Sequence, residues 1–250
     1  MSVQSEAELI QEISRLRAEL AVREREAAAK ERQLERYAAD LRETYKRERA
    51  RAQELRRSYT ETVRALSNAV EARDAYTGKH AERVAAYGLE IAGAVGLKLT
   101  ERPELEFGFL LHDVGKVAVP DAILFKPGPL TDEERALMEQ HPVIGAQIVS
   151  GIEFMEEAVE VVRSHHERWD GAGYPDGLAA DQIPLSARVF AVADVLDALT
   201  TDRPYRPASS LKEARAMIVA ETGTHFDPVV VEAFNEIADS RFELVAAEIG

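Results

Sequence analysis

Apolar residues recur at alternating intervals of four and three positions through the first part of the chain. They comprise Leu9, Ile13, Leu16 and Leu20, followed in a shifted register by Leu34, Ala38, Leu41, Tyr45, Ala52, Leu55 and Tyr59. Such spacing places the apolar side chains on one side of a helix, and the shift indicates a stutter. Residues 1–77 contain neither glycine nor proline. The pattern therefore predicts one long helix.

The apolar stripe of this helix has two interpretations. A lone helix could remain solvated and be supported by ion pairs between its many charged residues. A helix of this length is more stable, however, when a partner covers its stripe. We therefore favour a parallel coiled coil over residues 1–72 that pairs two copies of the chain in a homodimer.

The pattern changes after Gly78, where glycine, proline and aromatic residues become frequent. Amphipathic stretches separated by turn signals predict an all-α globular domain over residues 73–250, and no strand alternation competes with them. Helices are expected near residues 79–96, 103–117, 131–149, 155–166, 186–200, 210–222 and 228–239.

Several of these helices have recognisable start signals. Thr131 with Glu134, and Ser210 with Glu213, have the spacing of capping boxes. Proline at 228 follows an aspartate, which is typical of a helix start. The segment 167–185 is rich in Gly, Pro and Asp and is too long for a simple connection, so it is expected to be a functional loop.

Composition limits the classes of function. The 250 residues include no cysteine, so any metal must be held by histidine and carboxylate. The formal net charge is −14, and the acidic excess lies in residues 73–250, which disfavours DNA or RNA as a partner. We find no signal-peptide pattern and no apolar run long enough for a membrane span, so a cytoplasmic protein is expected.

Histidines next to apolar residues are the first candidates for chemistry. His112 and Asp113 directly follow Phe109, Leu110 and Leu111, where an uncompensated charge is costly to bury. In isolation, a hydrogen-bonded core pair explains such residues better than a metal site does. Further histidines at 80, 141, 165 and 166 change that balance in favour of a cation.

Asp194 adds a carboxylate to this set. Its helix, predicted over residues 186–200, is apolar on nearly all sides. A solvent-facing carboxylate is the simpler interpretation, but Val192, Ala193, Val195 and Leu196 leave little polar surface for it. A buried carboxylate directed at a cation explains Asp194 better.

Together these residues suit two divalent cations that share Asp113 as a bridging ligand. Two such cations can activate water and polarise a phosphodiester. Imidazole and carboxylate ligands favour iron or manganese, and zinc is possible. The candidate metal ligands are His80, His112, Asp113, His141, His165, His166 and Asp194.

The chain resembles the HD-GYP family of HD-domain phosphohydrolases over roughly residues 70–240. The matching motifs are YTGKHAERV at 76–84, HDVGKVAVPDAIL at 112–124, KPGPL at 126–130, HHERWDGAGYPDGL at 165–178, IPLSARVFAVADVLDALTTDRPYR at 183–206 and GTHFDP at 223–228. The resemblance implies an all-helical HD fold, a metal centre at the seven candidate ligands, and cyclic di-GMP as the substrate. We expect hydrolysis, mainly to the linear dinucleotide, by a hydroxide that bridges the two metals.

The resemblance also assigns roles to residues around the metals. It implies that Lys116 contacts the scissile phosphate and assists departure of the leaving oxygen, with Asp113 as the other catalytic residue. Residues implied to bind the substrate are Lys116, Gly173, Tyr174, Pro175, Arg203 and Arg206. His225 is assigned to structure.

One position departs from the pattern of some family members. They have a glutamate, a ligand for a third metal, four residues before His80, where this chain has Tyr76. A phenol with a pKa of about 10 is a poor ligand at neutral pH, so two metals are expected. Two alternative functions remain open. One is an HD-type phosphohydrolase for another cyclic nucleotide or a mononucleotide, and the other is a non-catalytic nucleotide-binding signalling module.

Overall fold

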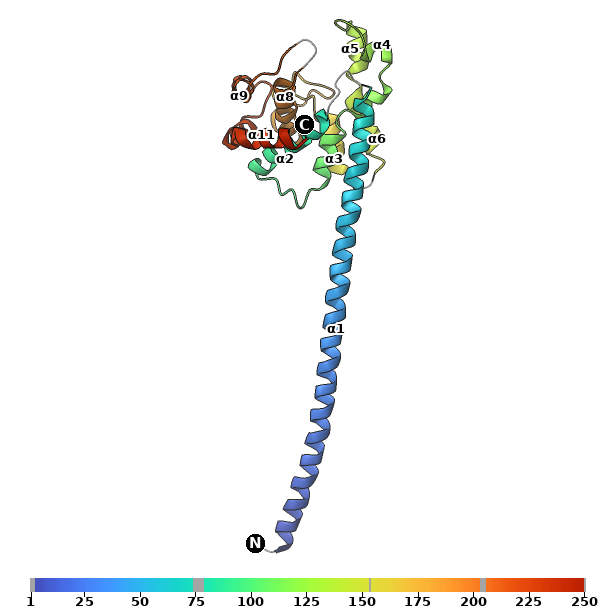
Figure 1. Cartoon of the computed structure of the whole chain (residues 1–250), viewed down its shortest axis with the longest axis vertical. Coiled ribbons are helices and arrows are strands. Elements are labelled where there is room, and N and C mark those ends of the chain that lie inside the picture. The colour runs from blue at the N-terminus through green and yellow to red at the C-terminus, as the bar shows by residue number, and fades with distance from the viewer. Residues whose placement is uncertain (1–2, 74–78, 153, 203–205, 250) are drawn as a thin grey trace. The chain divides into compact units, whose positions relative to one another are not determined.

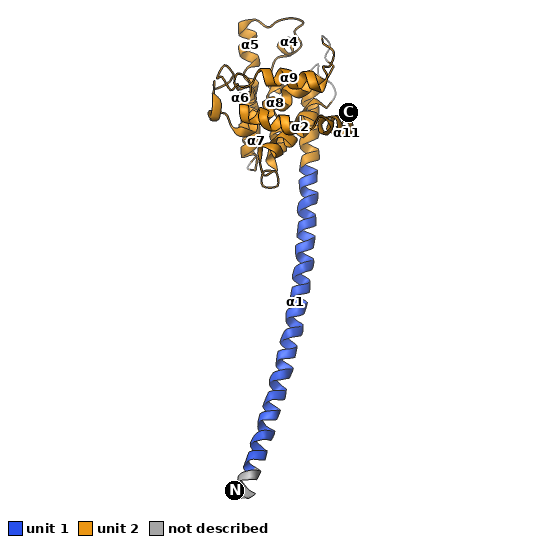
Figure 2. Ribbon diagram, turned by 90° about the vertical axis from the view of Figure 1, so that its left-hand side faces the viewer, with its two compact units in different colours: residues 1–59 blue, residues 60–250 orange. Residues whose placement is uncertain are grey.

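The computed structural model describes residues 3–73, 79–152, 154–202 and 206–249, with side chains from residue 8 onward. The chain forms two compact units, residues 1–59 and residues 60–250 (Figure 2). Tyr76 and Arg203 lie outside the described residues.

The first unit consists of the greater part of helix α1, Val3–Glu71. Its apolar stripe faces solvent in the single chain: Leu34 is 67% exposed and Leu41 is 71% exposed. Ion pairs within one helical turn, such as Arg15 with Glu12 at 2.8 Å, support the helix along its length. The long N-terminal helix is confirmed, but it ends at Glu71, before the predicted end at Thr77.

The second unit is an all-α domain, and no named strand occurs within its described residues. Its helices (Figure 1) are α2 His80–Val95, α3 Glu104–Leu110, η1 Val114–Ala118, α4 Asp121–Leu124, α5 Asp132–Met138, α6 His141–Val149, α7 Glu156–Ser164, η2 Ala180–Gln182, α8 Leu185–Thr200, α9 Leu211–Ala220, α10 Pro228–Glu236 and α11 Asp239–Ile249. Helix α2 packs against α8, α3 packs against α7, and η1 packs against α6.

The core of the second unit is formed by fully buried aromatic and aliphatic side chains. Phe109, Phe190 and Phe234 are each 0% exposed. The last turns of α1 belong to this core, because Val63 is buried in it and the Ser67 hydroxyl donates to the Leu110 carbonyl oxygen over 2.6 Å. None of the described helices combines the length and the apolar character needed to cross a membrane.

The predicted helix starts are confirmed. The Thr131 hydroxyl accepts from the Glu134 N–H, and the Glu134 carboxylate accepts from the Thr131 N–H. Ser210 and Glu213 make the same pair of bonds. The side chain of Asp227 caps α10 by accepting from the Val229 N–H over 2.8 Å.

Two of the expected helices are each divided in two. The helix predicted over 103–117 is divided into α3 and η1 by a turn at residues 111–113. The helix predicted over 131–149 is divided into α5 and α6, because Pro142 lacks an N–H and cannot continue the preceding helix. Helix α11 follows α10 and was not predicted as a separate element. Both breaks place candidate ligands at helix ends.

Candidate metal centre

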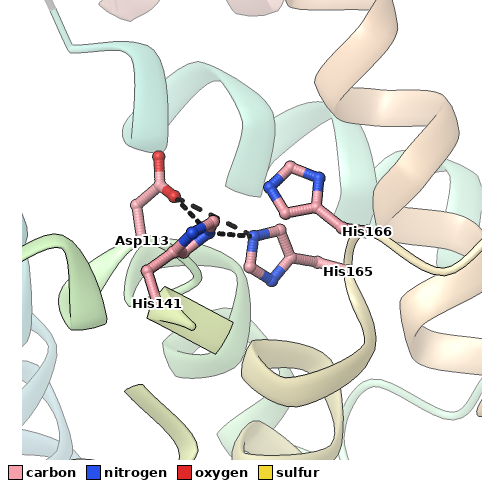
Figure 3. Close-up of side chains that lie close together, drawn as sticks. All are labelled: Asp113, His141, His165 and His166. Carbon is pink, nitrogen blue, oxygen red and sulfur yellow. Dashed lines mark hydrogen bonds and ion pairs between the residues drawn. The ribbon is translucent and has the colours of Figure 1, made fainter. Parts of the chain in front are cut away.

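Four of the predicted ligands form one compact cluster, Asp113, His141, His165 and His166 (Figure 3). One ligand atom from each lies within 4.8 Å of the ligand atoms of the other three. Asp113 Oδ1 is 3.3 Å from His141 Nε2 and 3.9 Å from His165 Nε2. The two Nε2 atoms are 3.2 Å apart. The side chains point toward one another, as ligands around a cation do.

Hydrogen bonds to the main chain orient three of the histidines. His112 Nδ1 faces the Phe109 carbonyl oxygen at 2.9 Å, and His165 Nδ1 faces that of Val162 at 2.9 Å. His141 Nδ1 faces the carbonyl oxygen three residues earlier, at 2.8 Å. A carbonyl only accepts, so Nδ1 carries a hydrogen, and in the neutral ring Nε2 is left with the lone pair that a cation binds. Such second contacts are typical of metal-ligating histidines, and these residues therefore fit a cation.

The end of α7 explains how adjacent histidines both reach the cluster. Neighbouring side chains on a helix diverge by about 100 degrees. Helix α7 ends at Ser164, and the chain turns through His165 and His166, whose ring centroids are 4.1 Å apart. The helix end thus allows two consecutive residues to contribute to one site.

Close packing of η1 on α6 requires a glycine. A Cβ atom at Gly115 would lie 1.9 Å from the His141 carbonyl oxygen and 2.6 Å from the Gly145 nitrogen. With no side chain at 115, the segment that carries Asp113 and Lys116 can lie against the start of α6. The glycine therefore brings Asp113 within reach of His141.

The other carboxylate oxygen of Asp113 faces a different group of side chains. Oδ2 lies 3.1 Å from His112 Nε2 and 2.7 Å from the Lys116 ammonium nitrogen. His80 extends this side of the site, with its ring centroid 5.5 Å from that of His112 and its Nε2 3.4 Å from Asp194 Oδ1. The two oxygens of Asp113 thus lie between two neighbouring groups formed by the other six predicted ligands.

Charge and burial keep the cluster residues in the forms that bind a cation. Burial alone would raise the pKa of Asp113, but Lys116 and His112 hold it well below its usual range. Burial and the neighbouring histidines lower the pKa of His165 well below its ordinary value, and lower that of His166 to about 3. At neutral pH these groups are an anionic carboxylate and neutral imidazoles, which are the ligating forms.

The sequence profile of the HD domain family matches residues 64–230, which is more than half of the chain. The chain belongs to the HD domain family. The match begins within α1, ends within α10 and contains all seven candidate ligands. The resemblance inferred from the motifs is thereby confirmed.

Two relatives illustrate the functions found among similar proteins. The cyclic di-GMP phosphodiesterase response regulator RpfG of Xanthomonas campestris is 40% identical over 219 residues, covering 86% of this chain and 55% of the relative. The 3'3'-cGAMP-specific phosphodiesterase 2 of Vibrio cholerae is 42% identical over 196 residues, covering 78% of this chain and 38% of the relative. The chain thus spans about half or less of the length of these relatives.

A solved structure supports the fold assignment. The crystal structure of a cyclic GMP-AMP-specific phosphodiesterase of Vibrio cholerae matches with a TM-score of 0.57 and 22% identity. The match covers 75% of this chain and 53% of that structure. At this identity the likeness concerns the fold of the HD domain.

The loop after α7 places further predicted residues of this HD domain beside the cluster. The Tyr174 ring stacks on the His166 ring, with centroids 4.7 Å apart and an angle of 28°. Gly173 lies close to the His166 main chain, because a Cβ atom there would be 2.5 Å from its carbonyl oxygen. Pro175 follows Tyr174 through a cis peptide bond. The arrangement puts the Tyr174 ring at the edge of the cluster of candidate ligands.

Arg206 is placed differently from the loop residues. It is exposed, and its guanidinium donates to the Ala198 carbonyl oxygen of α8 over 2.5 Å. In this HD domain it therefore contacts the main chain near the end of α8. Arg203, the other arginine predicted to bind the substrate, lies outside the described residues.

Sequence reasoning missed two buried carboxylates of the HD domain. Glu167 is 3% exposed and accepts from the Asp176 N–H at 2.8 Å and the Leu178 N–H at 3.0 Å, so it holds the loop that carries Tyr174. Asp197 is 2% exposed and contacts His80. The burial of Asp197 could have been predicted from its position one turn after Asp194 in an apolar helix. The sequence around Glu167 contains no feature that predicts its burial.

Proposed function

We propose that this HD domain is a metal-dependent phosphodiesterase of the HD-GYP type that hydrolyses cyclic di-GMP, mainly to the linear dinucleotide. The observation that carries the proposal is the position of Asp113, whose Oδ1 faces Nε2 of His141 and His165 and whose Oδ2 faces Nε2 of His112. The relative named as a cyclic di-GMP phosphodiesterase, which matches 86% of this chain, supports this substrate.

The metal centre is proposed to hold two divalent cations, iron or manganese. Asp113 is shared between His141, His165 and His166 on one side and a second group on the other. That second group is His80, His112 and Asp194. When bound, the cations supply Lewis-acid polarisation of the phosphodiester and a nucleophile at neutral pH.

The side chains around the centre are proposed to bind and orient the substrate. Lys116 lies beside Asp113 and is 21% exposed, so its ammonium can reach a phosphate oxygen and donate a proton to the departing 3′ oxygen. The Tyr174 face, with Gly173 and Pro175, is suited to contact a nucleobase. Arg203 and Arg206 are proposed to contact phosphate.

A second substrate, 3'3'-cGAMP, deserves a direct comparison. The relative specific for that dinucleotide is 42% identical over 78% of this chain. The two substrates differ in one base and share the backbone that the metal centre would cleave. Discrimination must therefore come from contacts to the base.

The test is hydrolysis of both dinucleotides by the full chain, purified without oxygen and assayed with added Mn²⁺ or Fe²⁺. We expect faster turnover of cyclic di-GMP and accumulation of its linear product. Asp113→Ala should lose at least one cation. Its activity should fall by more than about a hundredfold, because removing only a group that supports a metal ligand already costs up to about a hundredfold. Absence of hydrolysis with either metal would contradict the proposal, and preference for 3'3'-cGAMP would correct the substrate.

The N-terminal helix is proposed to pair two copies of the chain as a parallel coiled coil. The support is the exposed stripe of α1 in the first unit, with its heptad-like spacing. A second copy of the same helix presents an identical stripe and can cover it over its whole length.

A further inference from the structure

The ring of His80 is held differently from the rings of three other histidines of the site. Its Nδ1 lies 2.7 Å from a side-chain atom, Oδ2 of Asp197. His112, His141 and His165 instead direct Nδ1 at main-chain carbonyls of their own segments. His80 is the first residue of α2, and the partner of its Nδ1, Asp197, lies on α8. The orientation of its ring therefore depends on a residue distant in sequence.

Asp197 and Asp194 lie one turn apart on α8 and face His80 from two sides. Asp194 Oδ1 is 3.4 Å from Nε2 of His80, opposite the bond to Asp197. A carboxylate anion can only accept a hydrogen bond, so the bond to Asp197 places the hydrogen on Nδ1. In the neutral ring Nε2 then carries the lone pair, and it is directed toward Asp194.

Arg83 fixes Asp197 from the other side. Its Nε lies 2.6 Å from Asp197 Oδ1, and its terminal nitrogen Nη2 lies 3.1 Å from Oδ2. Arg83 is one turn after His80 on α2, so two residues of one helix hold the same carboxylate. The buried carboxylate is thus held between an imidazole and a guanidinium, which fix its position on both sides.

We propose that Asp197 is a positioning residue that fixes the tautomer and ring orientation of His80, so that His80 and Asp194 together hold a divalent cation. Asp197 acts through His80 and is not itself a ligand of the cation. Carboxylate partners of this kind orient ligating histidines and increase their basicity. The inference rests on the proposed function only in requiring the metal centre.

The experiment is a titration of the full chain with Mn²⁺ after chelation, with free Mn²⁺ followed by electron paramagnetic resonance. The variants are Asp197→Asn, His80→Ala and the double variant. We expect two Mn²⁺ equivalents in the unaltered chain and a roughly 10- to 100-fold weaker second equivalent in Asp197→Asn. If Asp197 acts through His80, the double variant should match His80→Ala, because the position has no ring left to orient.

Asp239→Asn is the control, since it breaks another arginine–aspartate ion pair of the domain, between Asp239 of α11 and the partly buried Arg215 of α9 at 2.6 Å. It should bind both Mn²⁺ equivalents as tightly as the unaltered chain does. Circular dichroism will check that each variant keeps its helix content. Should Asp197→Asn not fold, Arg83→Gln removes the second partner of Asp197 and should weaken the same equivalent to a smaller extent.

Unchanged Mn²⁺ binding by Asp197→Asn, or additive losses in the double variant, would overturn the inference. An unaltered chain that binds no Mn²⁺ would overturn both this inference and the proposed function. An unaltered chain that binds two equivalents and hydrolyses no cyclic dinucleotide would contradict the function alone.

Discussion

His141 and His165 direct their Nε2 atoms at each other across 3.2 Å, while the Nδ1 atom of each ring faces a main-chain carbonyl oxygen. When both rings are neutral, both Nε2 atoms carry lone pairs, which repel each other at this distance unless a positive charge lies close to both. Asp113 Oδ1, 3.3 Å from His141 Nε2, adds a negative charge to the same space. A bound cation removes this repulsion.

Mn²⁺ should consequently stabilise the chain against unfolding. At a free concentration about a hundredfold above the dissociation constant, one bound ion contributes about 2.7 kcal/mol, which should raise the melting temperature by several degrees. Mg²⁺ is the control, because it prefers oxygen ligands and should have a much smaller effect. Differential scanning calorimetry of chelated protein, with Mn²⁺ or Mg²⁺ added, measures the melting temperature. Equal increases with both ions would contradict a site built from imidazole.

Lys116→Ala should lower kcat for the cyclic dinucleotide by roughly a hundredfold, because a positioned proton donor contributes at least that much. The Mn²⁺ stoichiometry should not change, since the Lys116 ammonium contacts Asp113 Oδ2 and leaves Oδ1 to the histidines. Steady-state kinetics combined with metal analysis separates the two effects. A variant with normal kcat would assign Lys116 a purely structural role.

Gly115→Ala should disrupt the metal centre although residue 115 is not a ligand. The added Cβ would lie 1.9 Å from the His141 carbonyl oxygen, so η1 and α6 must separate and Asp113 must move from His141. We expect lost Mn²⁺ binding and a lower melting temperature. Gly93→Ala is the matched control: its Cβ would be 4.0 Å from the nearest atom, and alanine should stabilise α2 by up to about 1 kcal/mol. Normal Mn²⁺ affinity in Gly115→Ala would refute the packing argument.

Glu167→Gln should raise KM for the cyclic dinucleotide with little change in bound metal. The carboxylate accepts two N–H groups of the loop that carries Tyr174, and an amide offers only one accepting oxygen. Leaving a buried donor unpaired costs about 1–3 kcal/mol, so an increase of roughly tenfold is expected. Asp181→Asn, in which a 90% exposed carboxylate of the same loop is replaced, should leave KM unchanged. The same KM in both variants would exclude a role for Glu167 in substrate binding.

Leu34→Asp combined with Leu41→Asp should convert a dimer into a monomer, because the two charges would lie within the apolar stripe of α1. Sedimentation equilibrium of the full chain measures the difference directly. Arg36→Asp, a change at an exposed polar position of the same helix, should leave the dimer intact. An unaltered chain that sediments as a monomer would exclude the coiled coil.

The sequence predicted the helices and their caps well, because capping boxes such as Thr131 with Glu134 depend on residues close in the chain. It was less successful at the breaks after α3 and α5. The turn after α3 precedes Gly115, whose tertiary contact with α6 overrides local helix preference, whereas the break after α5 is caused locally by Pro142.

The ligand candidates could be named from residue type and motif, whereas the residues that hold them could not. Asp197 contacts His80 across 117 positions of sequence, and the contact depends on how α2 packs on α8. Nothing in the local sequence distinguishes the buried Glu167 from an exposed glutamate. Long-range packing therefore had to be seen before positioning groups could be separated from surface charges.

Main-chain hydrogen bonds to His112, His141 and His165 have a further consequence for how tightly a cation binds. Each of these rings is immobilised when the domain folds, so its rotamer entropy is lost before any ion arrives. A site preorganised in this way loses little additional freedom on binding, which increases affinity without adding a contact. Selectivity follows from the same rigidity, because a ring that cannot tilt will favour ions whose ligand distances match its fixed position.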